Sequence, residues 1–267
     1  MNELKAKVTE LLSNKTIDVF IGFGQGTGDR MRAVFIRTSE QAEKLIYNEN
    51  CDQNLAVYLL KDDAKRLGKI GFLASNFALR SMMQLASECQ IKDGQIFALH
   101  ITANNEIIEF TDFKSIEEHL QTVDTGIPVP EKEMIAKLNA MSVQERYEFW
   151  TKEFSKCFKC YACRAACPMC YCHRCTTDCN QPQWIPVASH EMGNLDWHLM
   201  RTMHLGGRCV NCGECAKACP MDIPLNLLTY QLIDGIQADF GAVAGMKADA
   251  VYALSTFKPE DKENFII

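Results

Sequence analysis

Twelve of the 14 cysteines lie between residues 157 and 219, and two stretches of that region share one spacing. CFKCYACRAACP begins at Cys157, and CVNCGECAKACP begins at Cys209. Each reads C-x2-C-x2-C-x3-C-P, a spacing that binds 4Fe-4S clusters in pairs. Three closely spaced thiolates hold one cluster from a single loop, while the helical x3 step carries the fourth thiolate towards the neighbouring cluster. The repeated motif therefore predicts two clusters whose fourth ligands are exchanged.

This exchange draws each set of four thiolates from both motifs. The first predicted set is Cys157, Cys160, Cys163 and Cys219, and the second is Cys209, Cys212, Cys215 and Cys167. Paired zinc sites would explain the C-x2-C steps, but they do not require a third cysteine at the same interval. A disulfide framework would need an oxidising compartment.

Four cysteines of the same region have no place in this scheme: Cys170, Cys172, Cys175 and Cys179. Four soft thiolates within ten residues suit a third iron–sulfur cluster or a tetrahedral zinc ion. Since the twelve clustered cysteines divide into three groups of four, we expect a third 4Fe-4S cluster. A zinc site and free or redox-active thiols are the alternatives. His173 and Asp178 are near enough in sequence to replace one of the thiolates.

The charge around the cysteines differs from the charge of the whole chain. The 267-residue chain has a net charge of −6, which argues against a protein built mainly to bind nucleic acid. Residues 156–220 instead carry seven basic and four acidic side chains. Because clusters bound by four thiolates are anionic, basic side chains nearby would stabilise them. For any single basic residue, an ordinary solvated side chain is the alternative.

The N-terminal residues help to predict the cellular compartment of the protein. MNELKAKVTELLSNK is charged and helical in pattern, and it lacks the apolar core and cleavage site of a signal peptide. No run approaches the roughly 18 apolar residues of a spanning helix. We therefore expect a cytoplasmic protein without a membrane span. In that reducing compartment, dense cysteines indicate metal binding or catalysis more often than disulfides.

The elements that position these cysteines change character along the chain. Before the cysteines, KIGFLA, FALRSMMQLASEC and QIFALHIT form a strand–helix–strand pattern. Strands are expected at 17–23, 33–37, 69–74 and 95–102. Helices are expected at 3–13, 39–48 with an N-terminal cap, 55–67, 77–89, 141–157 and 223–236. The last two flank the cysteine region on either side.

These patterns predict an α+β chain. A small α/β docking domain would occupy 1–122, and a linker that begins with VDTGIPVP would occupy 123–140. A ferredoxin-like domain of the bacterial two-cluster type, with the extra cysteine-rich insertion and a C-terminal helix, would span 141–237. Residues 238–267 would form a docking tail, with a disordered terminus as the alternative.

Other candidate residues have ordinary structural interpretations. IGFGQGTGD at 21–29 is rich in glycine but lacks the dinucleotide fingerprint before a helix. A strand-connecting loop is therefore the default, and a flavin or nucleotide site is the alternative. Cys51 and Cys89 are interpreted as small buried hydrophobes. Three histidines are interpreted as packing and hydrogen-bonding residues: His190, His198 and His204.

Several blocks of the sequence resemble a known family. These blocks are KCFKCYACRAACPMCYCHRC, WHLMRTMHLGGRCVNCGECAKACPMDIPL and a tail that ends in PEDKENFI. They are similar to iron–sulfur subunits of the formate dehydrogenase beta-chain type, which are relatives of the beta subunits of deazaflavin-reducing hydrogenases. The resemblance is specific over 145–267 and fainter over 1–122. SNFALR at 75–80 stands where many relatives have a cysteine-containing loop.

The resemblance implies a non-catalytic electron-transport subunit of an anaerobic oxidoreductase complex. It would relay single electrons through its 4Fe-4S clusters between flavoprotein and catalytic subunits. The complex would be of the formate dehydrogenase, hydrogenase or heterodisulfide-reductase type. One alternative is a flavin-bearing subunit that reduces a deazaflavin or nicotinamide coenzyme. Another is a zinc-stabilised interaction or regulatory module.

Overall fold

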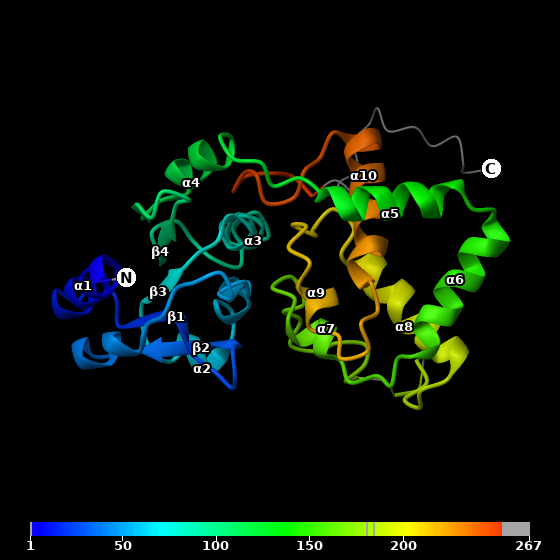
Figure 1. The fold of residues 1–267 in the computed structure, drawn as a ribbon, viewed down its shortest axis with the longest axis horizontal. Helices are drawn as coiled ribbons and strands as arrows, with labels where there is room; N and C mark the ends of the chain where they lie inside the picture. Colours follow the sequence, from blue (N-terminus) through cyan, green and yellow to red (C-terminus); the bar gives the residue numbers. More distant parts are fainter. Residues whose placement is uncertain (1, 180, 184, 253–267) are drawn as a thin grey trace.

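The chain folds into two lobes, each with a hydrophobic core of its own (Figure 1). The computed structural model describes residues 2–179, 181–183 and 185–252. The first lobe contains a five-stranded sheet. In the described ranges, the second lobe consists of helices joined by loops that carry the clustered cysteines.

The sheet of the first lobe is parallel at its centre and antiparallel at both edges. Its strands are β1 (Val19–Gln25), β2 (Met31–Ile36), β3 (Ile70–Leu73), β4 (Ile96–Ile101) and β5 (Ile107–Phe110), in the order β2-β1-β3-β4-β5. The central strands β1, β3 and β4 run parallel, whereas β2 and β5 pair antiparallel to their neighbours. The central strands are almost continuously buried, as expected of parallel strands covered on both faces.

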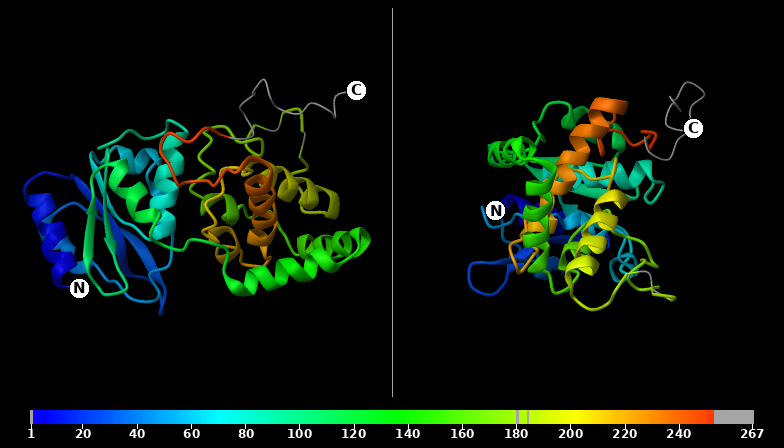
Figure 2. Two further views of the ribbon diagram at one scale, coloured as in Figure 1. Left: turned by 90° about the horizontal axis from the view of Figure 1, so that it is seen from above. Right: turned by 90° about the vertical axis from the view of Figure 1, so that its right-hand side faces the viewer.

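Helices cover both faces of this sheet. They are α1 (Asn2–Ser13), α2 (Asp62–Lys65), α3 (Asn76–Ser87) and α4 (Phe113–Leu120), with 3-10 helices η1 (Ser39–Lys44) and η2 (Leu55–Tyr58). Figure 2 shows α1 on one face and α3 with α4 on the other, the side turned towards the second lobe. The predicted strand–helix–strand unit is confirmed as β3-α3-β4. The glycine-rich segment ends β1 and forms the hairpin turn to β2, as the default interpretation predicts.

Two helices predicted in the first lobe are wrong in extent. The predicted helix at 39–48 is the short 3-10 helix η1, and its N-cap makes no side-chain hydrogen bond. The predicted helix at 55–67 divides into η2 and the single turn α2. Beyond η1, Ile46 donates its amide to Phe23 O of β1 at 2.8 Å and not to a carbonyl of the preceding turn.

The second lobe is built from six helices in the described ranges. They are α5 (Val129–Ala140), α6 (Val143–Ser155), α7 (Ala162–Ala165), α8 (Glu191–His204), α9 (Glu214–Lys217) and α10 (Leu225–Phe240). The helices predicted at 141–157 and 223–236 are confirmed as α6 and α10. A capping box of Ser142 and Glu145 starts α6. The segment predicted as a linker contains α5, whose Ile135 and Leu138 belong to the second core.

After α10 the chain crosses back to the first lobe as a segment that we call the return arm, residues 241–252 (Figure 1). Arg80 of α3 donates to Ala244 O from Nε and Nη2, at 3.2 and 2.6 Å. The same guanidinium donates from Nη1 to Thr125 O at 3.0 Å, on the segment that leaves the first lobe. One buried side chain therefore fixes the points at which the chain leaves the first lobe and returns to it.

A glycine allows the return arm to approach α3 closely. Gly245 has φ +74°, and a Cβ atom at this position would lie 2.3 Å from Arg80 O. Its amide donates to Gln84 Oε1 at 2.9 Å. The predicted docking tail is thus described as far as residue 252, and 253–267 lie outside the described residues. No helix in the described ranges has the length and apolar character needed to cross a bilayer.

Candidate metal centres

The two cysteine motifs have the same backbone conformation. In the first motif Lys159 and Tyr161 have φ of 57° and 58°, and in the second Asn211 and Gly213 have φ of 68° and 73°. These residues stand on either side of the second cysteine of each motif. The one-turn helices α7 and α9 follow at once. Non-glycine residues rarely adopt positive φ, so this shared loop is a specific feature of the C-x2-C-x2-C spacing.

The shared loop directs main-chain amides at sulfur. The amide of Lys159 donates to Cys157 Sγ at 3.4 Å. Burial raises the pKa of the Cys209 thiol to about 11, and a hydrogen bond from the amide of Asn211 acts against this rise. Amides that point at sulfur stabilise the thiolate over the thiol. Each motif therefore provides a preformed donor for a sulfur ligand at the same position.

The first predicted set of cysteines surrounds one small cavity. Its lining includes Cys157, Cys160, Cys163 and Cys219, together with Tyr161, Trp197 and His198. Burial raises the pKa of the Cys163 thiol to about 11, and the charges of Cys157 and Cys219 add to that rise. The charge of Cys219 also raises the pKa of the Cys157 thiol. The last cysteine of the second motif thus lies beside the cysteines of the first.

The second predicted set lies where the lobes meet, with Cys215 buried and its other three members half-buried. Burial raises the pKa values of the Cys209, Cys212 and Cys215 thiols, and the charge of Cys167 raises them further. Cys167 and Cys209 also pack against the core of the first lobe, whereas Cys215 belongs to the second core. The last cysteine of the first motif therefore lies among the first three cysteines of the second.

The remaining four cysteines are less closely grouped. Cys170, Cys172 and Cys175 line a cavity of ≈ 520 Å³ between α8 and the cysteine loop, and Cys179 is not among its lining residues. The amide of Cys170 donates to Cys167 O at 3.1 Å, and interaction between the two side chains lowers the pKa of the Cys167 thiol. Cys172 and Cys179 are exposed. Cys170 thus lies next to Cys167, a member of the second set.

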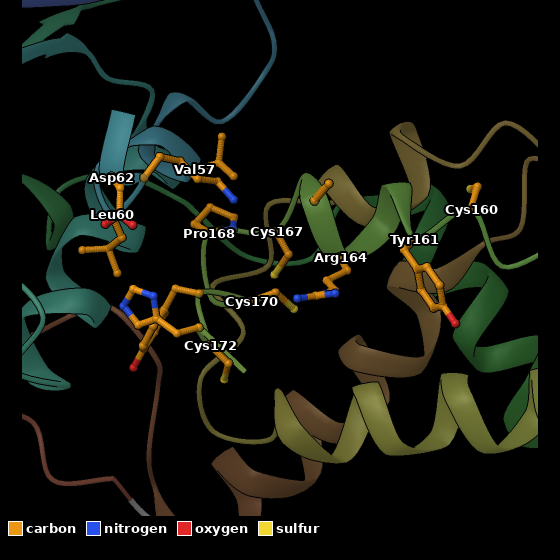
Figure 3. A pocket seen from close by; sticks show the side chains of 14 residues that line it. Val57, Leu60, Asp62, Cys160, Tyr161, Arg164, Cys167, Pro168, Cys170 and Cys172 are labelled. Atoms are coloured by element: carbon orange, nitrogen blue, oxygen red, sulfur yellow. The ribbon is translucent and has the colours of Figure 1, made fainter. Parts of the chain in front are cut away.

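The two residues considered as replacement ligands differ in their surroundings. Asp178 accepts from Arg164 at 2.9 and 2.5 Å, and this pairing lowers the pKa of its carboxyl group. His173 is exposed and lines a second cavity of ≈ 380 Å³ between the lobes, shown in Figure 3. Across residues 2–179, 181–183 and 185–252, no three Cys, His, Asp or Glu side chains converge as ligands of a single metal ion.

Two of the basic residues counted in the sequence are buried. Lys159 is 7% exposed, and its ammonium group donates to Pro186 O. Arg201 of α8 is 4% exposed. Burial alone would lower the pKa of Arg201, but electrostatic interaction with nearby cysteines, Cys215 and Cys167 first among them, outweighs burial and raises it. For these two residues, the alternative of an ordinary solvated side chain is wrong.

His198 lies against the first set. Its ring stacks on Phe154 with centroids 4.5 Å apart, as the packing interpretation predicts. Its Nε2 is buried and has no partner in the described part of the chain. Burial, followed by the charges of Arg201 and Lys159, lowers the pKa of His198 to about 4, so the ring is neutral at pH 7. A neutral imidazole can donate from one nitrogen to sulfur.

The remaining isolated residues are only partly as predicted. Cys89 is exposed at a positive φ, so its interpretation as a buried hydrophobe is wrong. Cys51 is half-buried and donates weakly to Ile46 O. His190 accepts from the amide of Gly193 as the N-cap of α8, which agrees with a hydrogen-bonding role.

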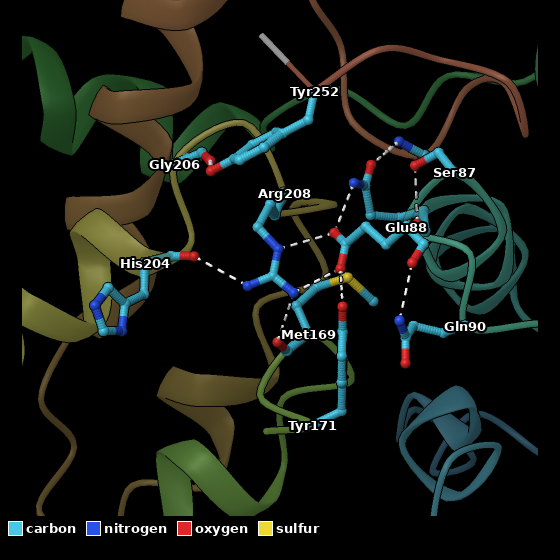
Figure 4. A network of polar contacts seen from close by, with 11 residues as sticks. Ser87, Glu88, Gln90, Met169, Tyr171, His204, Gly206, Arg208 and Tyr252 are labelled. Carbon is cyan, nitrogen blue, oxygen red and sulfur yellow. Dashed lines mark hydrogen bonds and ion pairs between the residues drawn. The ribbon is translucent and has the colours of Figure 1, made fainter. Parts of the chain in front are cut away.

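A polar network that the sequence did not reveal connects the lobes beside the second set (Figure 4). Glu88, which follows α3, accepts from Arg208 Nε at 2.8 Å and from Nη2 at 2.6 Å. Tyr171 donates its hydroxyl to the same carboxylate at 2.5 Å. Arg208 directly precedes Cys209, and Tyr171 stands between Cys170 and Cys172. Glu88 of the first lobe thus binds two residues that are adjacent in sequence to clustered cysteines, Tyr171 and Arg208.

The donor groups fit iron–sulfur clusters in their chemistry. Soft thiolates gather in groups drawn from two motifs, main-chain amides point at sulfur, and a buried guanidinium lies among the thiolates. These are the features that bind an anionic cluster and adjust its reduction potential.

Comparison with known proteins places the chain near formate dehydrogenase subunits. It is 32% identical over 136 residues to a protein of Methanocaldococcus jannaschii named F420-dependent formate dehydrogenase subunit beta. That match covers 47% of this chain and 35% of the relative. The chain is also 30% identical over 115 residues to F420-dependent formate dehydrogenase 1 subunit beta of Methanococcus maripaludis, covering 42% and 29%. The chain thus spans about a third of the length of the curated relatives it matches. No family model matches it.

These relatives confirm the resemblance to formate dehydrogenase beta subunits at the level of sequence similarity.

Proposed function

We propose that this chain is an electron-transfer subunit that relays single electrons through 4Fe-4S clusters in a cytoplasmic complex of the formate dehydrogenase type. The observation that carries the proposal is the proximity of each fourth cysteine to the other motif. The charge of Cys219 raises the pKa values of Cys157 and Cys163. The charge of Cys167 raises the pKa values of cysteines of the second motif. The similarity to two formate dehydrogenase beta subunits supports the same class of complex.

The residues of this chain would set the properties on which such a relay depends. A bound 4Fe-4S cluster supplies a one-electron carrier whose potential depends on net charge, hydrogen bonds to sulfur and exposure to solvent. The amides of Lys159 and Asn211 donate to sulfur. Arg201 places a positive charge among the thiolates. The second core places Trp197 and Ile223 beside Cys163, with Cys157 and Cys219 packed against it. The chain itself would make and break no substrate bonds.

A third cluster at Cys170, Cys172, Cys175 and Cys179 extends this proposal. Three of these cysteines share the lining of the larger cavity, and two of the four are exposed. An exposed carrier would suit the exchange of electrons with flavoprotein and catalytic subunits. Those partners would be of the formate dehydrogenase, hydrogenase or heterodisulfide-reductase type.

The exchange of ligands gives a sharp test of the two ferredoxin-type sets. Protein purified anaerobically should contain about eight irons for two clusters or about twelve for three, with matching sulfide. Cys219→Ser and Cys160→Ser should then alter the same EPR signal of the reduced protein. Cys167→Ser and Cys212→Ser should alter the other signal. Cys89→Ser, an exposed cysteine outside the sets, is the control and should leave both signals intact.

Two results would contradict the proposal. If Cys219→Ser alters the same signal as Cys212→Ser, the ligands are not exchanged and each motif binds its own cluster. If the wild-type chain contains zinc and no sulfide, it is not an iron–sulfur relay. For the third site, Cys172→Ser with Cys175→Ser should remove about four irons. An unchanged iron content in that double variant excludes the third cluster.

The names of the relatives favour a second candidate, a flavin-bearing subunit that reduces a deazaflavin coenzyme. Both relatives are named as F420-dependent. Acid denaturation of the anaerobically purified chain should release a fluorescent flavin if this candidate is correct. A chain with full iron content and no released flavin supports the relay alone.

A further inference from the structure

Arg201 of α8 is a buried basic residue beside the first cysteine motif. Its Nη2 donates to the main-chain oxygen of Cys163, a member of the first set, at 3.2 Å. Cys215 and Cys167, both of the second set, are the cysteines whose charges act most strongly on Arg201. One guanidinium therefore contacts a ligand segment of the first set and lies within electrostatic reach of the second.

The Nε–H donor of this guanidinium is unused. Arg201 Nε is fully buried and has no hydrogen-bond partner within the described residues. A buried N–H without a partner is unfavourable by roughly 1–3 kcal/mol, and more in a charged group. Such an atom in a well-packed core indicates a missing acceptor. The cysteines whose charges act on Arg201 are Cys215 and Cys167 of the second set, Cys170, and Cys163 of the first set.

The charge of Arg201 also has no carboxylate partner. None of the ion pairs among the described residues includes Arg201. The groups that act most strongly on it are four cysteine side chains, those of Cys215, Cys167, Cys170 and Cys163. A buried charge needs an opposite charge close by. The anionic partner for Arg201 is therefore expected from sulfur ligands of both sets.

We propose that Arg201 is the shared counter-charge of the two ferredoxin-type clusters and that its Nε–H donates to a sulfur atom between them. This inference rests on the proposed function. Because a nearby positive charge favours the more negative, reduced form of a cluster, Arg201 raises the reduction potentials of both. It acts as a positioning and charge-compensating residue and makes no contact with a substrate.

The first test compares reduction potentials in three variants of the full chain. Arg201→Met removes the charge and the donors, and Arg201→Lys keeps only the charge. Arg174→Gln is the matched control, since Arg174 is an exposed arginine of the same cysteine-rich region. Iron and sulfide are quantified first, and each cluster is then titrated anaerobically with EPR detection.

We expect Arg201→Met to lower both midpoints. The ratio of reduced to oxidised cluster at a fixed potential should fall about tenfold, which corresponds to 59 mV for a one-electron couple. Arg201→Lys should show a smaller shift, and Arg174→Gln should titrate as the wild type does. Unchanged midpoints in a fully loaded Arg201→Met protein, or a shift of only one cluster, would overturn the proposal. A wild-type chain without iron and sulfide would instead refute the proposed function itself.

A second measurement needs no neutral variant and remains informative if Arg201→Met fails to fold or to bind iron. The wild-type chain is produced with 15N in arginine only, reduced, and examined by pulsed EPR for nitrogen coupled to a cluster. We expect a 15N coupling that disappears in Arg201→Lys. The absence of any such coupling in the wild type contradicts the proposed donor, as does a coupling that persists in Arg201→Lys.

Discussion

The ion pair between Glu88 and Arg208 should stabilise the contact between the lobes more than any exposed pair of the chain. Its side chains are 11% and 16% exposed. The Glu88 carboxylate also accepts from Tyr171 and from Gln84 Nε2. Glu88→Gln keeps the size of the side chain and removes the charge. Arg208 is then left with a partly buried charge that has lost its counter-ion.

The expected loss can be estimated from this geometry. Removing one partner of a buried ion pair typically destabilises a protein by about 3–5 kcal/mol. Because this pair is slightly exposed, we expect the lower end, about 3 kcal/mol. For a chain of this size, that loss corresponds to a decrease in Tm of roughly 6–12 °C. The exposed pair of Lys114 and Glu118, with atoms 3.9 Å apart, is the control, and Glu118→Gln should cost at most about 0.5 kcal/mol.

Tryptophan fluorescence suits the assay because Trp150 and Trp197 both belong to the core of the second lobe. Urea unfolding is followed anaerobically at pH 7 for Glu88→Gln, Arg208→Met and the double variant. A double-mutant cycle then isolates the coupling between the two side chains. A coupling energy near zero would refute the reasoning, as would a loss below about 1 kcal/mol in Glu88→Gln.

The same pair should make stability depend on acid. Burial opposes ionisation of Glu88, but hydrogen bonds from Arg208 and Tyr171 outweigh it and hold its pKa below the ordinary value of 4.5. The pair therefore contributes its full stability above pH 4.5, and this stability is lost as the pH falls through the lowered pKa. In Glu88→Gln that part of the pH dependence should disappear.

Two further predictions concern the first lobe and the return arm. Gly245→Ala should weaken the docking of the arm on Arg80 by about 1–3 kcal/mol, because φ is positive and the added Cβ meets backbone. Gly235→Ala, in open space within α10, should stabilise the protein by about 0.5–1 kcal/mol. Both variants are measured by thermal unfolding. Burial lowers the pKa values of His100 and His119, so stability should fall as the pH drops below 6.5, where the unfolded chain binds protons first. Replacing both histidines by Asn should flatten the unfolding midpoint between pH 7 and 5, and an unchanged slope would contradict this assignment.

Several elements could be predicted from the sequence because their signals are local. The capping box at Ser142 and the strand–helix–strand pattern at 69–102 depend on residues close together in the chain, and both occur in the structure. The segment 55–67 shows where such signals fail. Leu55, Leu59 and Ala64 are buried, as a helical pattern predicts. A 3-10 turn also brings residues i and i+3 to one side, so burial spacing could not distinguish it from an α-helix.

Within the candidate site, cysteine spacing predicts the ligand sets, whereas residues contributed by distant segments gave no signal in the sequence. The C-x2-C-x2-C-x3-C repeat indicated both ferredoxin-type sets, and the loops of both motifs share one backbone. Arg201 was noticed only as one of seven basic residues. Its burial depends on how α8 packs in the second lobe, which composition does not specify. Glu88 gave no signal, because Arg208 lies 120 positions away along the chain.

The guanidinium of Arg80 has a consequence for the topology of the molecule. By holding Thr125 and Ala244 together, it makes residues 125–244 a closed loop whose two ends are fastened to α3. The second lobe is in this sense an insert whose two ends meet at one helix, and further contacts such as that of Glu88 with Arg208 hold it against the first lobe. A protease that cuts the polypeptide at residues 126–128 would leave two pieces that still bind each other through the return arm. New termini placed in that segment would likewise preserve both lobes, so the connection there is dispensable for keeping the lobes together.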